Sequence, residues 1–162
     1  MPSSFGRLYG GRFISPNSKD RLMDSKSQQL PDGFAPYPEN SPFLDRVGPL
    51  FLKMDGMKPI IGLYICEHHC NNKGTAHGGL MATLADISLG KTAGWSQEPR
   101  VPLVTTSLTI DYFGAARLHD WIVTETDFNR VGSEMAFANC YVRSGDKALA
   151  RASGVFKVVR LR

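Results

Sequence analysis

The stretch from Gly78 to Trp95 constrains the fold of this chain more than any other feature. It reads as one long helix, and its only charged residues are Asp86 and Lys91. A helix that is apolar all round is buried against other elements rather than left on a surface. The remainder of the chain must therefore supply a layer that covers this helix.

Segments typical of β-strands lie on both sides of the helix in the sequence. Before it, residues 59–67 are rich in β-branched and aromatic side chains. After it come four more such segments, joined by short turn signals, at residues 102–113, 121–128, 134–143 and 148–159. Short turns join antiparallel strands. The expected fold class is thus α+β, with a curled antiparallel β-sheet wrapped around one long central helix.

The clearest alternation is in residues 102–113. Apolar side chains fall on one face and polar ones on the other, as Val104, Leu108, Ile110 and Tyr112 against Thr105, Ser107, Thr109 and Asp111. A period of two over such a length predicts a strand. It also puts Thr105 on the polar face of that strand.

The N-terminal part of the chain has a different character. Residues 1–40 are rich in Ser, Pro, Gly and Lys without a regular period, and we interpret them as an irregular arm. The folded domain is expected over residues 41–162. It opens with Ser41-Pro42, a serine cap followed by a proline that suits a first helical turn, and Gly48-Pro49 ends that short helix.

Composition excludes several classes of protein. The chain has 162 residues, of which 42% are hydrophobic and 21% charged, as in an ordinary one-domain globular protein. The net charge of +4 forms no basic run, which argues against a nucleic-acid partner. No apolar run approaches the roughly 18 residues that would cross a membrane. Cys66, Cys70 and Cys140 make no disulfide framework, so we expect a cytoplasmic protein.

The residues around the start of the helix suggest chemistry. The run His77-Gly78-Gly79 opens the helix, where the first backbone N–H groups have no partner within the helix. The helix dipole favours negative charge at this end, and Gly78 and Gly79 allow a ligand to approach the backbone closely. Such donors suit an oxyanion hole, which stabilises a carbonyl oxygen as it gains charge.

Asp86 is unexpected in a helix whose only other charged residue is Lys91, because burying an unpaired carboxylate costs several kcal/mol. Its helix face also carries small residues, Gly79, Ala82, Gly90 and Ala93. Close approach by a substrate or by a second copy of the helix would suit this stripe. The spacing alone is equally consistent with small residues that only pack the helix against its neighbours and with Asp86 paired to a distant arginine.

One family combines these residues. The pattern Asn71, Gly74, His77-Gly78-Gly79 and Asp86 resembles the signature of hotdog-fold acyl-CoA thioesterases of the phenylacetate-degradation (PaaI-like) type. The resemblance covers roughly residues 40–160. It implies the hotdog fold and the hydrolysis of an acyl-CoA thioester to a free acid and coenzyme A. It implies neither a cofactor nor a metal, since a thioester is already activated.

The resemblance also implies catalytic roles. Gly78 would donate its backbone N–H to the thioester carbonyl, and Asp86, reaching in from a neighbouring subunit, would act as general base or nucleophile. Asn71 would hold the attacking water or the carbonyl. His77 would brace the loop, and Thr105 would orient water and the carboxylate.

Further implied residues concern the substrate and the assembly. Arg130, Val131 and Gly132 form a turn that relatives place beside the coenzyme A tail, although a solvated surface arginine is an equally good account of Arg130. Gly79 and Phe113 would contact substrate. Because two chains would share each site, a homodimer or a homotetramer built as a dimer of dimers is expected.

The sequence also bears on a metal site, on an α/β-hydrolase fold and on a non-catalytic function. The segment Cys66, His68, His69 and Cys70 looks like a metal cluster, but zinc usually takes two separated pairs of ligands, so a strand end is the preferred account. No GxSxG elbow is present, which argues against an α/β-hydrolase. A non-catalytic acyl-CoA binding or sensing module on the same fold is the alternative function.

Overall fold

The computed structural model describes residues 29–39 and 41–159. The chain divides into two compact units at Leu30 and Pro31. Nearly all of the first unit lies outside the described residues, and with it most of the arm predicted for residues 1–40.

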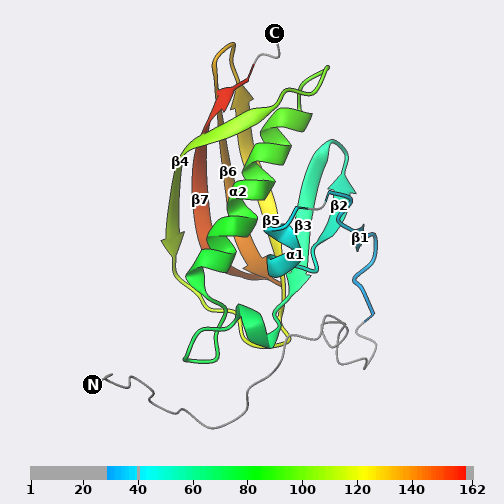
Figure 1. The fold of residues 1–162 in the computed structure, drawn as a ribbon, viewed down its shortest axis with the longest axis vertical. Helices are drawn as coiled ribbons and strands as arrows, with labels where there is room; N and C mark the ends of the chain where they lie inside the picture. The colour runs from blue at the N-terminus through cyan, green and yellow to red at the C-terminus, as the bar shows by residue number, and fades with distance from the viewer. Residues whose placement is uncertain (1–28, 40, 160–162) are drawn as a thin grey trace, which may run out of the picture. The chain divides into compact units, whose positions relative to one another are not determined.

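Seven strands form one antiparallel sheet (Figure 1). They are β1 (Ala35–Pro36), β2 (Phe51–Asp55), β3 (Lys58–Tyr64), β4 (Leu103–Tyr112), β5 (Trp121–Val131), β6 (Met135–Ser144) and β7 (Lys147–Val158). Their order in the sheet is β1-β2-β3-β5-β6-β7-β4, so β1 and β4 are its two edges. The short β1 lies in the stretch that was predicted as arm and pairs with β2.

The long helix α2 spans Gly78–Trp95, the bounds predicted from the sequence, and crosses one face of the sheet (Figure 1). Its sheet-facing side is fully buried at Leu84, Ala85 and Leu89. The opposite side is open in the protomer, because Gly79 is exposed and Asp86 partly exposed. The sheet therefore covers one side of α2 and leaves the side with the carboxylate accessible.

Two short helical segments flank this arrangement. Helix α1 spans Leu44–Val47, and the Ser41 Oγ accepts a hydrogen bond from the Leu44 N–H at 3.2 Å, close to the predicted cap. The 3-10 helix η1 spans Glu67–His69 and follows β3 directly.

Sequence reasoning missed β2. It pairs with β3 from Phe51↔Gly62 to Asp55↔Lys58, leaving a two-residue turn with Gly56 at a φ of 59°. A glycine at the first position of a two-residue turn between strand-like residues is a hairpin signal, so the sequence does carry the information.

A β-bulge in β4 corrects one prediction. Thr105 pairs with Phe156 and Ser107 with Val155, so Thr106 is an extra residue with no residue opposite it on β7. The bulge shifts the alternation by one. Thr105 therefore points to the α2 side of the sheet, and its predicted place on the polar face was wrong; Val104 takes the outer face and is 57% exposed.

The core lies between α2 and the sheet. Its largest fully buried side chains include Phe156, Ile61, Leu63, Ile122 and Val142, and Cys140 is buried among them as predicted. In the described part of the chain, no helix combines the length and apolar character needed to span a membrane.

Candidate active site

His77 is the N-cap of α2. Its backbone is extended, at φ −64° and ψ 137°, and its Nδ1 accepts a hydrogen bond from the Gly79 N–H at 2.9 Å. A ring nitrogen that accepts carries no proton, so in the neutral ring the proton is on Nε2. The side chain thus braces the start of the helix while its exposed Nε2–H can still donate.

Gly78 supplies the open donor at this helix end. The Gly79 N–H is taken by His77, and the Leu80 N–H is bonded to the His77 carbonyl at 3.0 Å. Within residues 29–39 and 41–159, the Gly78 N–H has no hydrogen-bond partner. The helix dipole adds to its ability to stabilise negative charge.

Tyr112 ties this helix end to β4, which sequence reasoning did not foresee. Its hydroxyl donates to the Gly78 carbonyl at 2.9 Å, and its ring lies 3.3 Å from the place a Cβ would take on Gly78. A tyrosine hydroxyl keeps its proton at neutral pH and can donate, and burial raises the pKa of Tyr112 further.

Asn71 closes the loop that leads to His77. Its Nδ2 donates to Thr75 Oγ1 at 3.0 Å, and its Oδ1 accepts from the Lys73 N–H at 2.8 Å. The loop also needs Gly74 at a φ of 72°, in the left-handed region that favours glycine. In this structure Asn71 shapes the loop, and its predicted hold on water or carbonyl stays a prediction.

Asp86 is held by Thr105. The Thr105 Oγ1 donates to Asp86 Oδ1 at 2.8 Å, across from β4 to α2. A threonine hydroxyl, rather than the distant arginine weighed from the sequence, is therefore its partner. Among the described residues the second carboxylate oxygen, Oδ2, has no hydrogen bond and is left for a ligand or water.

One protomer does not bring the donor and the carboxylate together. Gly78 and Asp86 are eight residues apart on α2, which corresponds to about 12 Å along a helix axis. A base and an oxyanion donor that act on one carbonyl must both lie within about 3 Å of the reacting atoms. The two halves of the predicted site are thus separate in a single chain.

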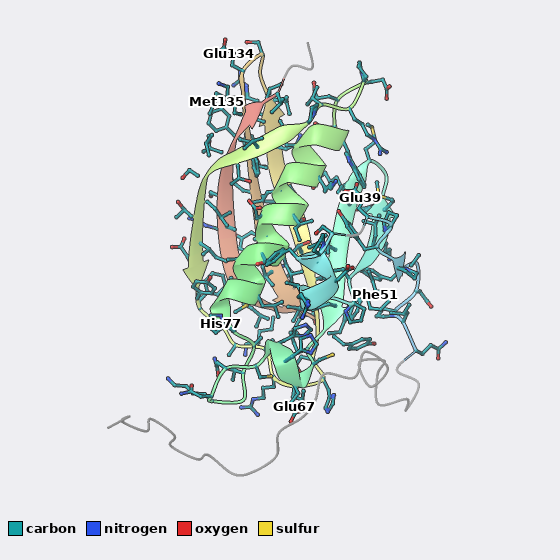
Figure 2. All side chains as sticks on the ribbon, viewed as in Figure 1. Glu39, Phe51, Glu67, His77, Glu134 and Met135 are labelled. Carbon is teal, nitrogen blue, oxygen red and sulfur yellow. The ribbon has the colours of Figure 1, made fainter. Side chains whose placement is uncertain are left out.

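Arg130 and Gly132, which were predicted beside the coenzyme A tail, lie far from the His77 end of α2 in one chain. An open hollow of about 390 Å³ is lined by Arg130, Gly132, Ser133, Glu134, Met135 and Phe137. Figure 2 labels Glu134 and Met135 at one end of α2 and His77 at the other. Phe113 directly follows Tyr112, the residue that bonds to Gly78, and is 57% exposed. Within one chain it can therefore contact a ligand at the Gly78 end of α2, and not a ligand in the hollow.

The cysteine and histidine cluster is engaged in hydrogen bonds. His69 Nε2 bonds to the Val47 carbonyl and its Nδ1 accepts from the Cys66 N–H, so both ring nitrogens are occupied. Across the described ranges, no three His, Cys, Asp or Glu side chains are grouped so that they would hold a metal ion.

Comparison with known proteins decides the family. The model of the thioesterase superfamily matches residues 73–150. A Pseudomonas aeruginosa protein named as a "putative esterase" is 45% identical over 128 residues, which cover 78% of this chain and 96% of that protein. The chain belongs to the thioesterase superfamily. Acyl-coenzyme A thioesterase 13 of Mus musculus is also similar, at 35% identity over 82 residues, or 51% of this chain and 58% of the mouse protein.

Solved structures agree on the fold of this thioesterase superfamily member. Zebrafish thioesterase superfamily member 2 aligns with a TM-score of 0.65 at 25% identity, covering 74% of this chain and 89% of that one. The phenylacetic acid degradation protein PaaI of Thermus thermophilus aligns with a TM-score of 0.62 at 21% identity, covering 74% and 100%. The predicted hotdog fold and the resemblance to PaaI-like thioesterases are confirmed.

Proposed function

We propose that this thioesterase superfamily member hydrolyses an acyl-CoA thioester to a free acid and coenzyme A. The observation that carries the proposal is the Asp86 carboxylate, held by Thr105 on the accessible side of α2. A carboxylate fixed by one oxygen and free at the other suits a general base. The similarity to the mouse acyl-coenzyme A thioesterase supports coenzyme A as the carrier.

The chemistry needs a base, a water molecule and an oxyanion donor. Asp86 takes a proton from water as the water oxygen bonds to the thioester carbon, or attacks that carbon itself. The Gly78 N–H donates to the carbonyl oxygen as it becomes negative. The C–S bond then breaks and the sulfur leaves as coenzyme A thiolate, which in the general-base route takes up the proton that Asp86 removed from water. In the nucleophilic route, loss of the thiolate leaves the acyl group joined to Asp86 as an anhydride. Water then hydrolyses this anhydride to the free acid and the Asp86 carboxylate, and the second proton of that water passes to the thiolate.

We infer that the active unit contains at least two chains, as a homodimer or a dimer of dimers. Strand β4 is an edge of the sheet, and an edge strand offers unpaired backbone groups to another strand. Thr105, near the start of β4, holds Asp86, whereas Tyr112, at its end, holds Gly78. If two copies of β4 pair antiparallel about a two-fold axis, Asp86 of one chain approaches the Gly78 end of the other.

The same pairing would bring the hollow of one chain close to the Gly78 end of its partner. A second hollow beside the first, of about 540 Å³, includes Pro102, which directly precedes β4, together with Arg100 and Gly132. In an antiparallel pair this end of β4 lies beside the Tyr112 end of the partner strand. Arg130 and Arg100 of one chain would then meet the phosphates of a coenzyme A whose thioester lies at the partner's Gly78.

A cytoplasmic location fits the proposed reaction. Cys66, Cys70 and Cys140 are all free, and free thiols persist in reducing compartments.

The test is release of free thiol from acyl-CoAs that vary in chain length and aromaticity. Release by the wild type and its near loss in Asp86→Asn would support the proposal, with Asp111→Asn as control. Asp111 is an exposed carboxylate on the outer face of β4, paired with Arg151, and its loss should leave turnover intact. Tight binding of acyl-CoA without thiol release would instead favour a binding or sensing module.

A further inference from the structure

His69 lies in η1 and is buried, with 4% of its surface exposed. Its ring makes two hydrogen bonds on opposite sides. Nε2 donates to the Val47 carbonyl, at the end of α1, at 2.6 Å, and Nδ1 accepts from the Cys66 N–H at 2.9 Å. The acceptor role of Nδ1 fixes the neutral ring with its proton on Nε2.

The main chain of His69 contacts the loop that leads into α2 and ends at His77. Its carbonyl oxygen accepts the hydrogen bond of the His77 N–H at 2.8 Å. Next to it, Cys70 and Ala76 form an isolated antiparallel bridge, which fastens the same two segments together. His69 therefore joins three parts of the fold, namely α1, η1 and the residue that caps α2.

We propose that His69 is a positioning residue for the oxyanion donor, acting through His77, an inference that rests on the proposed thioesterase function. The ring holds the His69 backbone, the His69 carbonyl holds the His77 amide, and Gly78 follows His77 directly. The Gly78 N–H is useful only if it points at the carbonyl oxygen as charge develops. A shift of about 1 Å in such a group can cost on the order of 100-fold in rate.

Three substitutions separate the two ring contacts. In His69→Asn the side-chain oxygen lies where Nδ1 was, so it can still accept from the Cys66 N–H but cannot reach Val47. In His69→Gln the amide nitrogen lies where Nε2 was, so it can still donate to the Val47 carbonyl. His69→Ala loses both, and His68→Ala, an exposed neighbour in the same turn, is the matched control.

We expect kcat to fall about 10- to 100-fold in His69→Ala with little change in KM, because the oxyanion contact is made in the transition state. His69→Gln and His69→Asn should each recover part of the loss. His68→Ala should match the wild type. Unchanged kcat in all three His69 variants would overturn the proposal, as would a kcat loss that merely tracks the fraction of unfolded protein.

Amide hydrogen exchange gives a readout that needs no turnover. In folded His69→Gln and His69→Asn the His77 amide should exchange faster than in the wild type, while amides in β6 and β7 should not. Unaltered exchange at His77 would contradict the proposed link. A wild type that releases no thiol would refute the thioesterase proposal, yet the exchange experiment would still decide whether His69 positions the loop.

Discussion

Thr105 donates a hydrogen bond from β4 to Asp86 on α2, with 2.8 Å between Oγ1 and Oδ1. The bulge at Thr106 makes this contact possible, because without it Thr105 would lie on the outer face of the sheet. A local irregularity in one strand thus aims the hydroxyl that holds the proposed catalytic carboxylate.

Removing that hydroxyl should slow turnover. Thr105→Val keeps the side-chain shape and loses one hydrogen bond to a charged group, which contributes roughly 1.5–3 kcal/mol. We expect kcat to fall about 10- to 100-fold, as measured by thiol release at saturating substrate. Thr109→Val, on the outer face of the same strand, is the control, and equal losses in the two variants would argue against a role for the Thr105–Asp86 contact.

Proline at position 78 should remove the oxyanion donor with little other change. Proline suits the first turn of a helix, and the extended backbone of His77 is the conformation that a residue before proline adopts. Gly78→Pro should lower kcat on the order of 100- to 1,000-fold, the cost of one oxyanion-hole donor. Gly78→Ala, which keeps the N–H and needs only a small shift of Tyr112, should lose much less. Similar activity in both variants would count against the Gly78 donor.

Replacing either of two glycines of α2 with alanine should change the stability of the fold, in opposite directions. A Cβ on Gly94 would lie 2.7 Å from the Val101 carbonyl oxygen, so Gly94→Ala should destabilise the fold by about 1–3 kcal/mol. A Cβ on Gly90 would touch the Phe156 ring at 3.4 Å, an ordinary contact, and alanine favours a helix by up to about 1 kcal/mol. Urea unfolding should therefore rank Gly90→Ala above the wild type and Gly94→Ala below it. The reverse order would contradict the packing of α2 against the Val101 carbonyl and against Phe156 of β7.

His69 should make stability depend on pH. Burial lowers the pKa of His69 below its ordinary value of 6.5, with His68 adding to the effect and the Val47 carbonyl opposing it. The unfolded chain then binds a proton more readily than the folded one, so stability is full above about pH 6.5 and falls as the pH drops toward the folded-state pKa. Urea unfolding at pH 7.5 and 5.5 should show the smallest difference in His69→Gln and the largest in the wild type, with His68→Gln between them because it removes one cause of the lowered pKa. An equal difference in all three would show that His69 is not the titrating group.

Much of the fold followed from the sequence because the signals were local. The bounds of α2 matched, since His77 and the glycines mark its start and polar residues follow Trp95. Strands β3 to β7 were found from alternation and turn residues, but the turn predicted at residues 130–132 was wrong in part, because Arg130 and Val131 are the last residues of β5 and pair with β6. The bulge at Thr106 was not, because its cause is the pairing of β4 with β7, which no local pattern records.

The candidate site was predictable in its residues and not in its geometry. The motif named Gly78 and Asp86, but only the fold places their partners Tyr112 and Thr105 at opposite ends of β4. His69 was weighed as a metal ligand, since a sequence shows which atoms are available and not which are already bonded to Val47 and Cys66.

The most direct test of the shared site uses mixed dimers of Asp86→Asn and Gly78→Pro. Each variant alone should be nearly inactive in thiol release. If Asp86 of one chain serves Gly78 of the other, a mixed dimer has one intact pair, and mixing the two proteins under conditions that exchange subunits should restore activity. Mixed dimers that form and yet remain as inactive as their parents would contradict the account.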